Sequence, residues 1–114
     1  MLSIIIPTLN EAHFLPGLLT DIKSQDLPEH EIIVSDGCSE DDTLQIAEQY
    51  NCRTVTSQNR NPAHQRNAGA KAALGDQYLF LDADTRIPDG FFPTVLDEFT
   101  SRKLDVAGFY FKLN

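Results

Sequence analysis

Two aspartates separated by one residue are the strongest chemical signal in this sequence. Asp82 and Asp84 directly follow the apolar residues Leu79, Phe80 and Leu81, a run typical of the end of a buried strand. Carboxylates in this position can share a hard cation, because Mg²⁺ takes one or two protein carboxylates together with substrate phosphates. An Asp-rich turn is the alternative, since Asp is a common turn residue. The pattern therefore predicts either a divalent-metal site or an ordinary turn.

Polar segments also follow the other strands that the sequence predicts. They are Pro7 to Glu11 after the first strand, Asp36 to Thr43 after the second, and Arg60 with Arg66 after the third. In a parallel sheet the carboxyl ends of the strands share one edge, where open α/β sheets bind ligands. We therefore expect these segments to meet Asp82 and Asp84 in space.

The chemistry that these residue types suggest is the binding of a nucleoside diphosphate. The Asp36 carboxylate can accept an imide N–H from a base, and Glu11 can accept from ribose hydroxyls. Arg60 and Arg66 can meet phosphate oxygens through forked guanidinium donors. A plainer interpretation stays open for each: Glu11 and Asp36 as turn caps, and Arg60 as a solvated surface arginine. His64, near both arginines, is expected on a helix surface.

Alternating strands and helices must position these groups. The predicted strands are Ser3–Ile6, ended by Pro7, then Glu31–Ser35, Arg53–Thr56, Gln77–Leu81 and Val106–Leu113. The predicted helices are Phe14–Gln25 and Leu44–Tyr50, the second with Asp41 or Asp42 as its cap. A third runs from Pro62 to Leu74, with Asn61 as N-cap, Pro62 as its first residue and Gly75 as its end, and a fourth follows Asp89 through Phe92, Val95, Leu96 and Phe99. Repeated βα units predict an α/β fold, a mainly parallel sheet with helices on both faces.

The bulk properties restrict the partners and the compartment. The chain has 114 residues, 41% of them hydrophobic, which suits one small domain, and its net charge of −8 argues against a nucleic-acid partner. It has no run of 18 apolar residues. We expect no signal peptide, because its first residues lack a basic region and a small-residue cleavage site. Cys38 and Cys52 lack metal-site spacing, so we expect two reduced thiols in a cytoplasmic protein.

The last predicted strand, Val106 to Leu113, is strongly apolar and ends the sequence. Such a strand needs cover, because an exposed sheet edge pairs with other chains. We therefore expect either a fragment of a longer enzyme or self-association through this strand.

Four segments resemble a known family when they are taken together. They are Ile4 to Glu11, Ile32 to Thr43, Arg66 to Gly69 and Leu79 to Thr85. In order and spacing they resemble the family-2 glycosyltransferases of the GT-A fold, over nearly the whole chain. The segment Asp82-Ala83-Asp84 matches the DxD motif of that family. Cys38 is a departure, since many members have Gly or Asp near this position.

The resemblance implies an enzyme that transfers a sugar, with inversion, from a UDP- or GDP-sugar to an acceptor hydroxyl. It implies Mg²⁺ or Mn²⁺ at Asp84 and Asp82, and an acceptor at the inner membrane face as one setting for the reaction. The donor-binding residues that it implies are Pro7, Thr8, Asn10, Glu11, Asp36, Gly37, Arg66, Asp82, Ala83 and Asp84. The family's catalytic base lies beyond the DxD motif, in an acceptor half that these 114 residues do not reach.

Two other classes of function remain as alternatives. A non-catalytic nucleotide-sugar-binding module would bind the donor without turnover. A phosphatase of the haloacid dehalogenase type also uses Asp-x-Asp after an apolar strand, but its motif follows an early strand, whereas three βα units precede Asp82 here.

Overall fold

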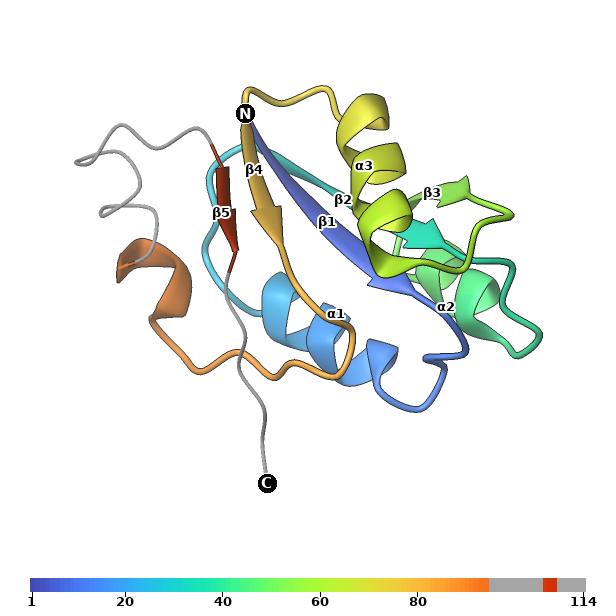
Figure 1. Cartoon of the computed structure of the whole chain (residues 1–114). Coiled ribbons are helices and arrows are strands. Elements are labelled where there is room, and N and C mark those ends of the chain that lie inside the picture. The colour runs from blue at the N-terminus through green and yellow to red at the C-terminus, as the bar shows by residue number, and fades with distance from the viewer. Residues whose placement is uncertain (95–105, 109–114) are drawn as a thin grey trace.

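The computed structural model describes residues 1–94 and 106–108, which form a five-stranded parallel sheet in the order β3-β2-β1-β4-β5 (Figure 1). The strands are β1 (Leu2–Thr8), β2 (His30–Asp36), β3 (Arg53–Thr56), β4 (Gln77–Phe80) and β5 (Val106–Gly108). The order reverses at β1, which pairs with β2 on one side and with β4 on the other. The predicted α/β fold with a parallel sheet is confirmed.

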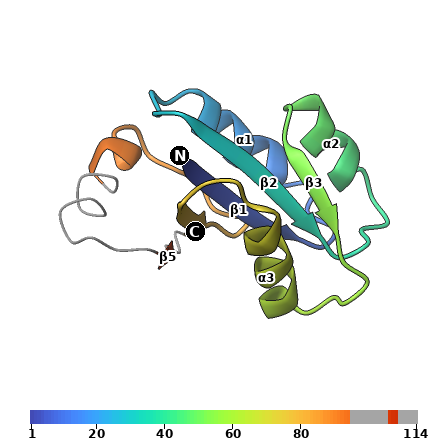
Figure 2. The ribbon, with the colours of Figure 1, turned by 90° about the horizontal axis from the view of Figure 1, so that it is seen from above.

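Helices cover both faces of this sheet, as predicted. The helices α1 (Leu15–Lys23) and α2 (Thr43–Gln49) lie on one face, and α3 (Pro62–Ala72) lies on the other (Figure 2). The side of α1 that packs against the sheet is apolar. Its residues recur at helical spacing and are all buried: Leu15, Leu18, Leu19 and Ile22. None of the helices in the described part of the chain is long and apolar enough to span a membrane.

The central strand is buried on both sides, which explains its unbroken run of isoleucines. Ile4 and Ile6 belong to the core cluster that includes α1, whereas Ile5 faces α3. A Cβ on Gly69 would lie only 2.5 Å from Cγ2 of Ile5. Glycine at this position therefore lets α3 approach β1 closely, and that approach brings the start of α3 to the carboxyl end of the sheet.

The structure corrects the prediction that Pro7 ends the first strand. β1 continues through Pro7 to Thr8, and Pro7 pairs in register with Ser35. The Ile5 carbonyl accepts from the Leu81 N–H on the β4 side, so Pro7, two residues later, faces the same side. β4 has ended there, and a missing N–H therefore removes no ladder hydrogen bond.

The predicted end of the third helix is also wrong by two residues. α3 stops at Ala72, because Ala73 adopts an extended conformation and the Leu74 N–H donates to Oε2 of Glu31 (2.6 Å) instead of to a helix carbonyl. Gly75 is not the cap; it packs against the Met1 carbonyl. The predicted start is confirmed, since the Asn61 side chain accepts from the Ala63 N–H (2.8 Å).

The remaining predictions fall partly outside the described residues. Residues 91–94 are helical, after Gly90 with φ 78°, and Phe92 is fully buried. Val95, Leu96, Phe99 and the segment Phe109 to Leu113 lie outside the described part. β5 pairs with β4 at the edge of the sheet.

Candidate functional site

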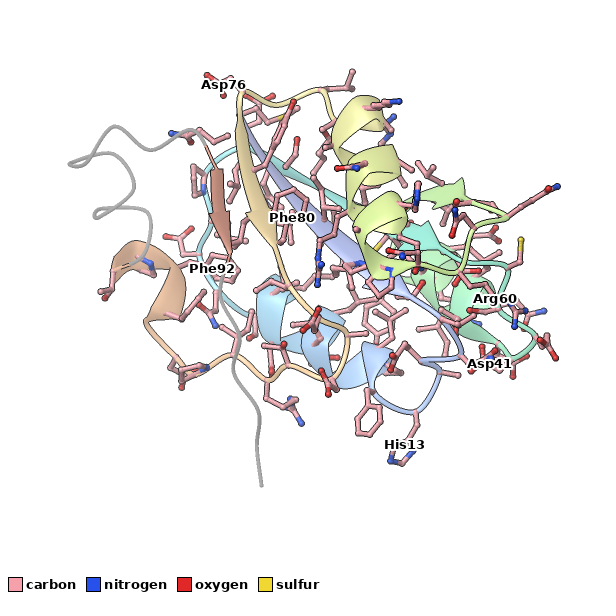
Figure 3. The ribbon with its side chains drawn as sticks, viewed as in Figure 1. His13, Asp41, Arg60, Asp76, Phe80 and Phe92 are labelled. Atoms are coloured by element: carbon pink, nitrogen blue, oxygen red, sulfur yellow. The ribbon has the colours of Figure 1, made fainter. Side chains whose placement is uncertain are left out.

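A cavity of about 260 Å³ lies at the carboxyl ends of β1 and β4, beside the start of α3. Its walls combine residues from three distant segments: Pro7, Thr8, Leu9, Glu11, Arg60, Pro62, Gln65, Asp82, Ala83 and Asp84. Figure 3 places Arg60 and Asp41 among the loops at this end of the molecule and Asp76 at the opposite end. The segments that follow the strands do meet, as the topology predicts.

Three carboxylates, those of Glu11, Asp82 and Asp84, line this cavity. Burial raises the pKa of Glu11 above its usual value, and the nearby charges of Asp84, Asp82 and Asp41 raise it further. Arg66 pairs with one of them, with Nη2 3.5 Å from Oδ1 of Asp82, and both side chains are about one-third exposed. The cavity therefore carries an excess of negative charge.

The donor set suits a divalent cation that a substrate completes. Within residues 1–94 and 106–108, no three His, Cys, Asp or Glu side chains form a group that could hold a metal alone. Mg²⁺ does not need such a cage, because one or two carboxylates plus substrate phosphates are enough. Asp82 and Asp84 line one cavity, and their charges already disfavour the ionised form of Glu11. These residues fit the cation.

The segment that carries Asp82 and Asp84 forms a turn and also lines the cavity. The Thr85 N–H donates to the Asp82 carbonyl (3.0 Å), which closes a turn over residues 82–85. Ala83 is buried at the centre of this turn, whereas Asp82 and Asp84 are partly exposed. The two interpretations of the Asp-x-Asp sequence are therefore compatible, because the turn presents both carboxylates to the cavity.

Side-chain hydrogen bonds tie the loop after β1 to the loop after β2. The Asn10 N–H donates to Ser39 Oγ (2.8 Å), and the Glu40 N–H donates to Oδ1 of Asn10 (2.8 Å). The Glu11 N–H donates to Thr43 Oγ1 (3.0 Å). Asn10 has φ 55°, which Asn tolerates better than most residues. Asn10 and its partners thus fix the backbone that carries Glu11.

Asp36 lies behind the cavity wall rather than on it. Its side chain is fully buried. The carboxylate accepts from Thr8 Oγ1 (2.7 Å), from Ser39 Oγ (2.5 Å) and from the Ser39 N–H (2.8 Å). Thr8 is the last residue of β1 and Ser39 lies in the loop after β2, so Asp36 ties that loop to the end of β1.

Gly37 and Cys38 follow Asp36, and each has an unusual backbone environment. The Gly37 N–H donates to the Thr8 carbonyl (2.9 Å), and a Cβ on Gly37 would lie 3.1 Å from Nε2 of Gln65. Cys38 has φ 60°, the left-handed conformation that glycine adopts most easily. The cysteine therefore stands at a position with backbone strain, which a glycine would relieve.

The two arginines have different surroundings. Arg60 lines the cavity, and its Nη2 contacts Oε1 of Glu40 (2.8 Å) and the Cys38 carbonyl (2.9 Å). Arg66 contacts Asp82 from α3. His64 is exposed on α3, as predicted.

Gln65 is a site residue that the sequence analysis missed. It is buried on the cavity wall, and Nε2 donates to the carbonyls of Thr8 (2.5 Å) and Ser35 (3.2 Å). Ser35 Oγ donates in return to the Gln65 carbonyl (2.6 Å). Gln65 thereby fastens α3 to the ends of β1 and β2. Its spacing of four residues from Gly69 places both on the sheet-facing side of α3 and is the signal that could have identified it.

This combination of fold and cavity defines an α/β ligand-binding domain whose site lies at the topological switch point of a parallel sheet. Residues 3–112 match glycosyl transferase family 2, and the chain belongs to that family. The match removes the phosphatase alternative.

Similar proteins include glycosyltransferases whose structures were solved with nucleotide sugars. Poly(ribitol-phosphate) β-N-acetylglucosaminyltransferase TarS of Staphylococcus aureus is 37% identical over 93 residues, which cover 75% of this chain and 16% of that protein. Its crystal structure with UDP-GlcNAc matches with a TM-score of 0.80 at 32% identity, over 90% of this chain and 32% of that one. The mannosyltransferase PcManGT of Pyrobaculum calidifontis, solved with GDP-Man and Mn²⁺, has a TM-score of 0.71 at 29% identity, over 76% of this chain and 28% of that one. The chain thus spans a third or less of the length of each of these proteins.

Proposed function

We propose that residues 1–114 form the nucleotide-sugar-binding domain of a glycosyltransferase that transfers a sugar from a UDP- or GDP-sugar to an acceptor hydroxyl. The observation that carries this proposal is the meeting of Glu11, Asp82 and Asp84 at one cavity, in a chain of this family. The UDP-GlcNAc and GDP-Man complexes of TarS and PcManGT support the donor class.

Each side of the cavity has its own role in this proposal. Asp82 and Asp84 would hold Mg²⁺ or Mn²⁺, which when bound neutralises charge on the diphosphate leaving group. Arg60 and Arg66 offer guanidinium donors to the phosphates. Glu11 would accept from ribose hydroxyls, and Pro7, Thr8 and Leu9 would form the wall beside the nucleoside.

Displacement of the diphosphate with inversion is the reaction that we propose for the whole enzyme. The acceptor hydroxyl attacks the anomeric carbon, loses its proton to a base outside these residues, and the bond to the diphosphate oxygen breaks. The chain's own residues act on the leaving-group side: they hold the donor and orient its phosphates. Proton NMR of the first product formed would test the stereochemistry, since a retained anomeric configuration contradicts inversion.

Calorimetric titration with UDP and with GDP tests the donor site. We expect binding with Mn²⁺ or Mg²⁺ and strong weakening in EDTA, because phosphate otherwise meets a negative cavity. Equal affinity in EDTA would contradict the metal role. Nucleotide binding without any transfer by the complete protein would favour a non-catalytic module.

Asp36 is proposed to select the base through its remaining acceptor position. A carboxylate has about four lone-pair sites, and three donors from Thr8 and Ser39 use three of them. Asp36→Asn replaces an acceptor by a donor, so we expect the ratio of UDP to ADP affinity to fall. An unchanged ratio, measured by calorimetry beside a thermal melt, would leave Asp36 as a loop anchor alone.

A further inference from the structure

A second cavity adjoins the donor site and has no role in the function described so far. It has a volume of about 310 Å³ and is lined by His13, Phe14, Gly17, Asp84 and Arg86. Asp84 also lines the donor cavity. A ligand in the second cavity would therefore lie across Asp84 from the nucleotide, next to the place where the donor's reacting end must be.

An aromatic platform forms one wall of this cavity. Phe14 is 49% exposed, although most large apolar side chains of the described part are buried. The His13 ring packs edge-on against it, with ring centroids 4.9 Å apart and planes at 83°. An exposed aromatic ring offers a flat apolar surface for a ligand ring.

Arg86 is fixed in place by two features of α1. Nε and Nη2 donate to the Asp21 carboxylate (2.8 and 3.0 Å), which also accepts from the Ile87 N–H (2.8 Å). A Cβ on Gly17 would lie 3.3 Å from Cζ, Nε and Nη1 alike, so the guanidinium lies flat over the helix. Glycine lowers helix stability, and its presence here makes room for Arg86.

The charge balance decides which ligand fits. Asp21 already neutralises Arg86 through a bidentate pair, and Asp84 adds a negative charge to the same wall. A phosphate would meet no net positive charge. Hydroxyl groups suit the wall better, because Arg86 Nη1 can donate and Asp84 can accept. A ring with an apolar face and polar edges matches Phe14 and these two groups together.

We propose that this second cavity is an acceptor subsite that takes a neutral, hydroxyl-bearing sugar or polyol unit on the Phe14 platform, beside Arg86. The assignment as an acceptor subsite rests on the proposed function, since it needs a sugar donor on the other side of Asp84. The sugar binding itself does not.

Saturation-transfer NMR with methyl β-D-glucopyranoside tests this subsite. We expect the glucoside to bind, and Phe14→Ala to weaken it at least about tenfold. Arg86→Lys should also weaken it, because lysine keeps the charge but loses the flat fork. Leu74→Ala is the matched control, since it also removes a large exposed apolar side chain (74% exposed) and should leave glucoside binding unchanged.

Calorimetry with UDP and Mn²⁺ on the same variants separates this proposal from the donor site. Phe14→Ala should leave UDP affinity within about twofold. Glucoside binding that falls equally in Phe14→Ala and Leu74→Ala, or no glucoside binding by the wild-type protein, would overturn the subsite. Displacement of the glucoside by inorganic phosphate would overturn it in favour of an anion site. If the glucoside binds through Phe14 but UDP does not bind, the sugar subsite is supported and the proposed donor site is contradicted.

Discussion

Glutamates at the two ends of the parallel sheet have pKa values that shift in opposite directions. At the amino ends of the strands, Glu31 accepts from Ser3 Oγ (2.6 Å), from the Leu74 N–H (2.6 Å) and from Arg53 Nη1 (2.5 Å). Burial raises its pKa, but these hydrogen bonds outweigh burial and lower it overall. At the carboxyl ends, burial and the charges of neighbouring carboxylates raise the pKa of Glu11.

This contrast separates a stabilising edge from a functional one. The Met1 ammonium group pairs with Asp76 (2.9 Å) at the amino end, where charges meet opposite charges. At the carboxyl end, like charges gather around a cavity. Unsatisfied charge of this kind lowers folding stability and is expected at sites that a ligand completes.

The largest expected effect is at Asp84, where one substitution should reduce ligand binding without reducing folding stability. Asp84→Ala should weaken nucleotide binding in Mn²⁺ by roughly 2–4 kcal/mol, because a charged contact to the bound cation disappears. Folding stability should not fall, since the variant removes repulsion from Glu11. Calorimetry with Mn²⁺ and with EDTA measures the first part. Unchanged affinity, or a marked loss of stability, would make Asp84 a structural turn residue.

Glu31 should show the reverse behaviour. Glu31→Gln loses charge-assisted hydrogen bonds and should lower the free energy of unfolding by about 1–3 kcal/mol, without changing nucleotide affinity. Because the folded pKa of Glu31 is lowered, the stability it contributes is present above its usual pKa and is lost as the pH falls. Urea unfolding at pH 7 and pH 4 checks both. Glu48→Gln, at an exposed position of α2, is the control that should change little.

The pKa shift of Glu11 is opposite to that of Glu31, so its effect on folding stability should also be opposite. Because its folded pKa is raised, it destabilises the fold once the pH rises above that pKa. Glu11→Gln should therefore raise the melting temperature at pH 7 without metal, by a few degrees if the gain is about 0.5–1 kcal/mol. The gain should vanish near pH 4. A variant that melts lower than the wild type at pH 7 would show that Glu11 is stabilising after all.

The smallest expected effect is at Cys38, which follows β2 at the carboxyl end of the sheet and has a strained, left-handed backbone conformation. Cys38→Gly should stabilise the protein by about 0.5 kcal/mol, as relief of left-handed strain exceeds the entropic cost of glycine. Asn51, at φ 61° after α2, is the matched control: Asn tolerates this conformation, so Asn51→Gly should gain nothing. Equal gains in both variants, in the same thermal melts, would contradict the argument.

Local patterns of the sequence determined the elements and the side of the sheet that carries the chemistry. Apolar runs fixed the strands, the spacing from Leu15 to Ile22 fixed the buried face of α1, and Asn61 with Pro62 fixed the start of α3. The position of Asp82 and Asp84 at a strand end also followed from sequence. These features depend on near neighbours and on period, which a sequence contains.

Contacts between distant segments decided the rest. Pro7 stays in its strand because the neighbouring strand has already ended. The buried Asp36 accepts from Thr8 at the end of β1 and from Ser39 in the loop after β2. Gln65 joins α3 to β1 and β2 across 57 and 30 residues of sequence. The charge environment of Glu11 depends on carboxylates more than 70 residues away. Hydrogen bonds and fields of this kind depend on distance in space, so only the tertiary structure assigns a partner or a pKa to each residue.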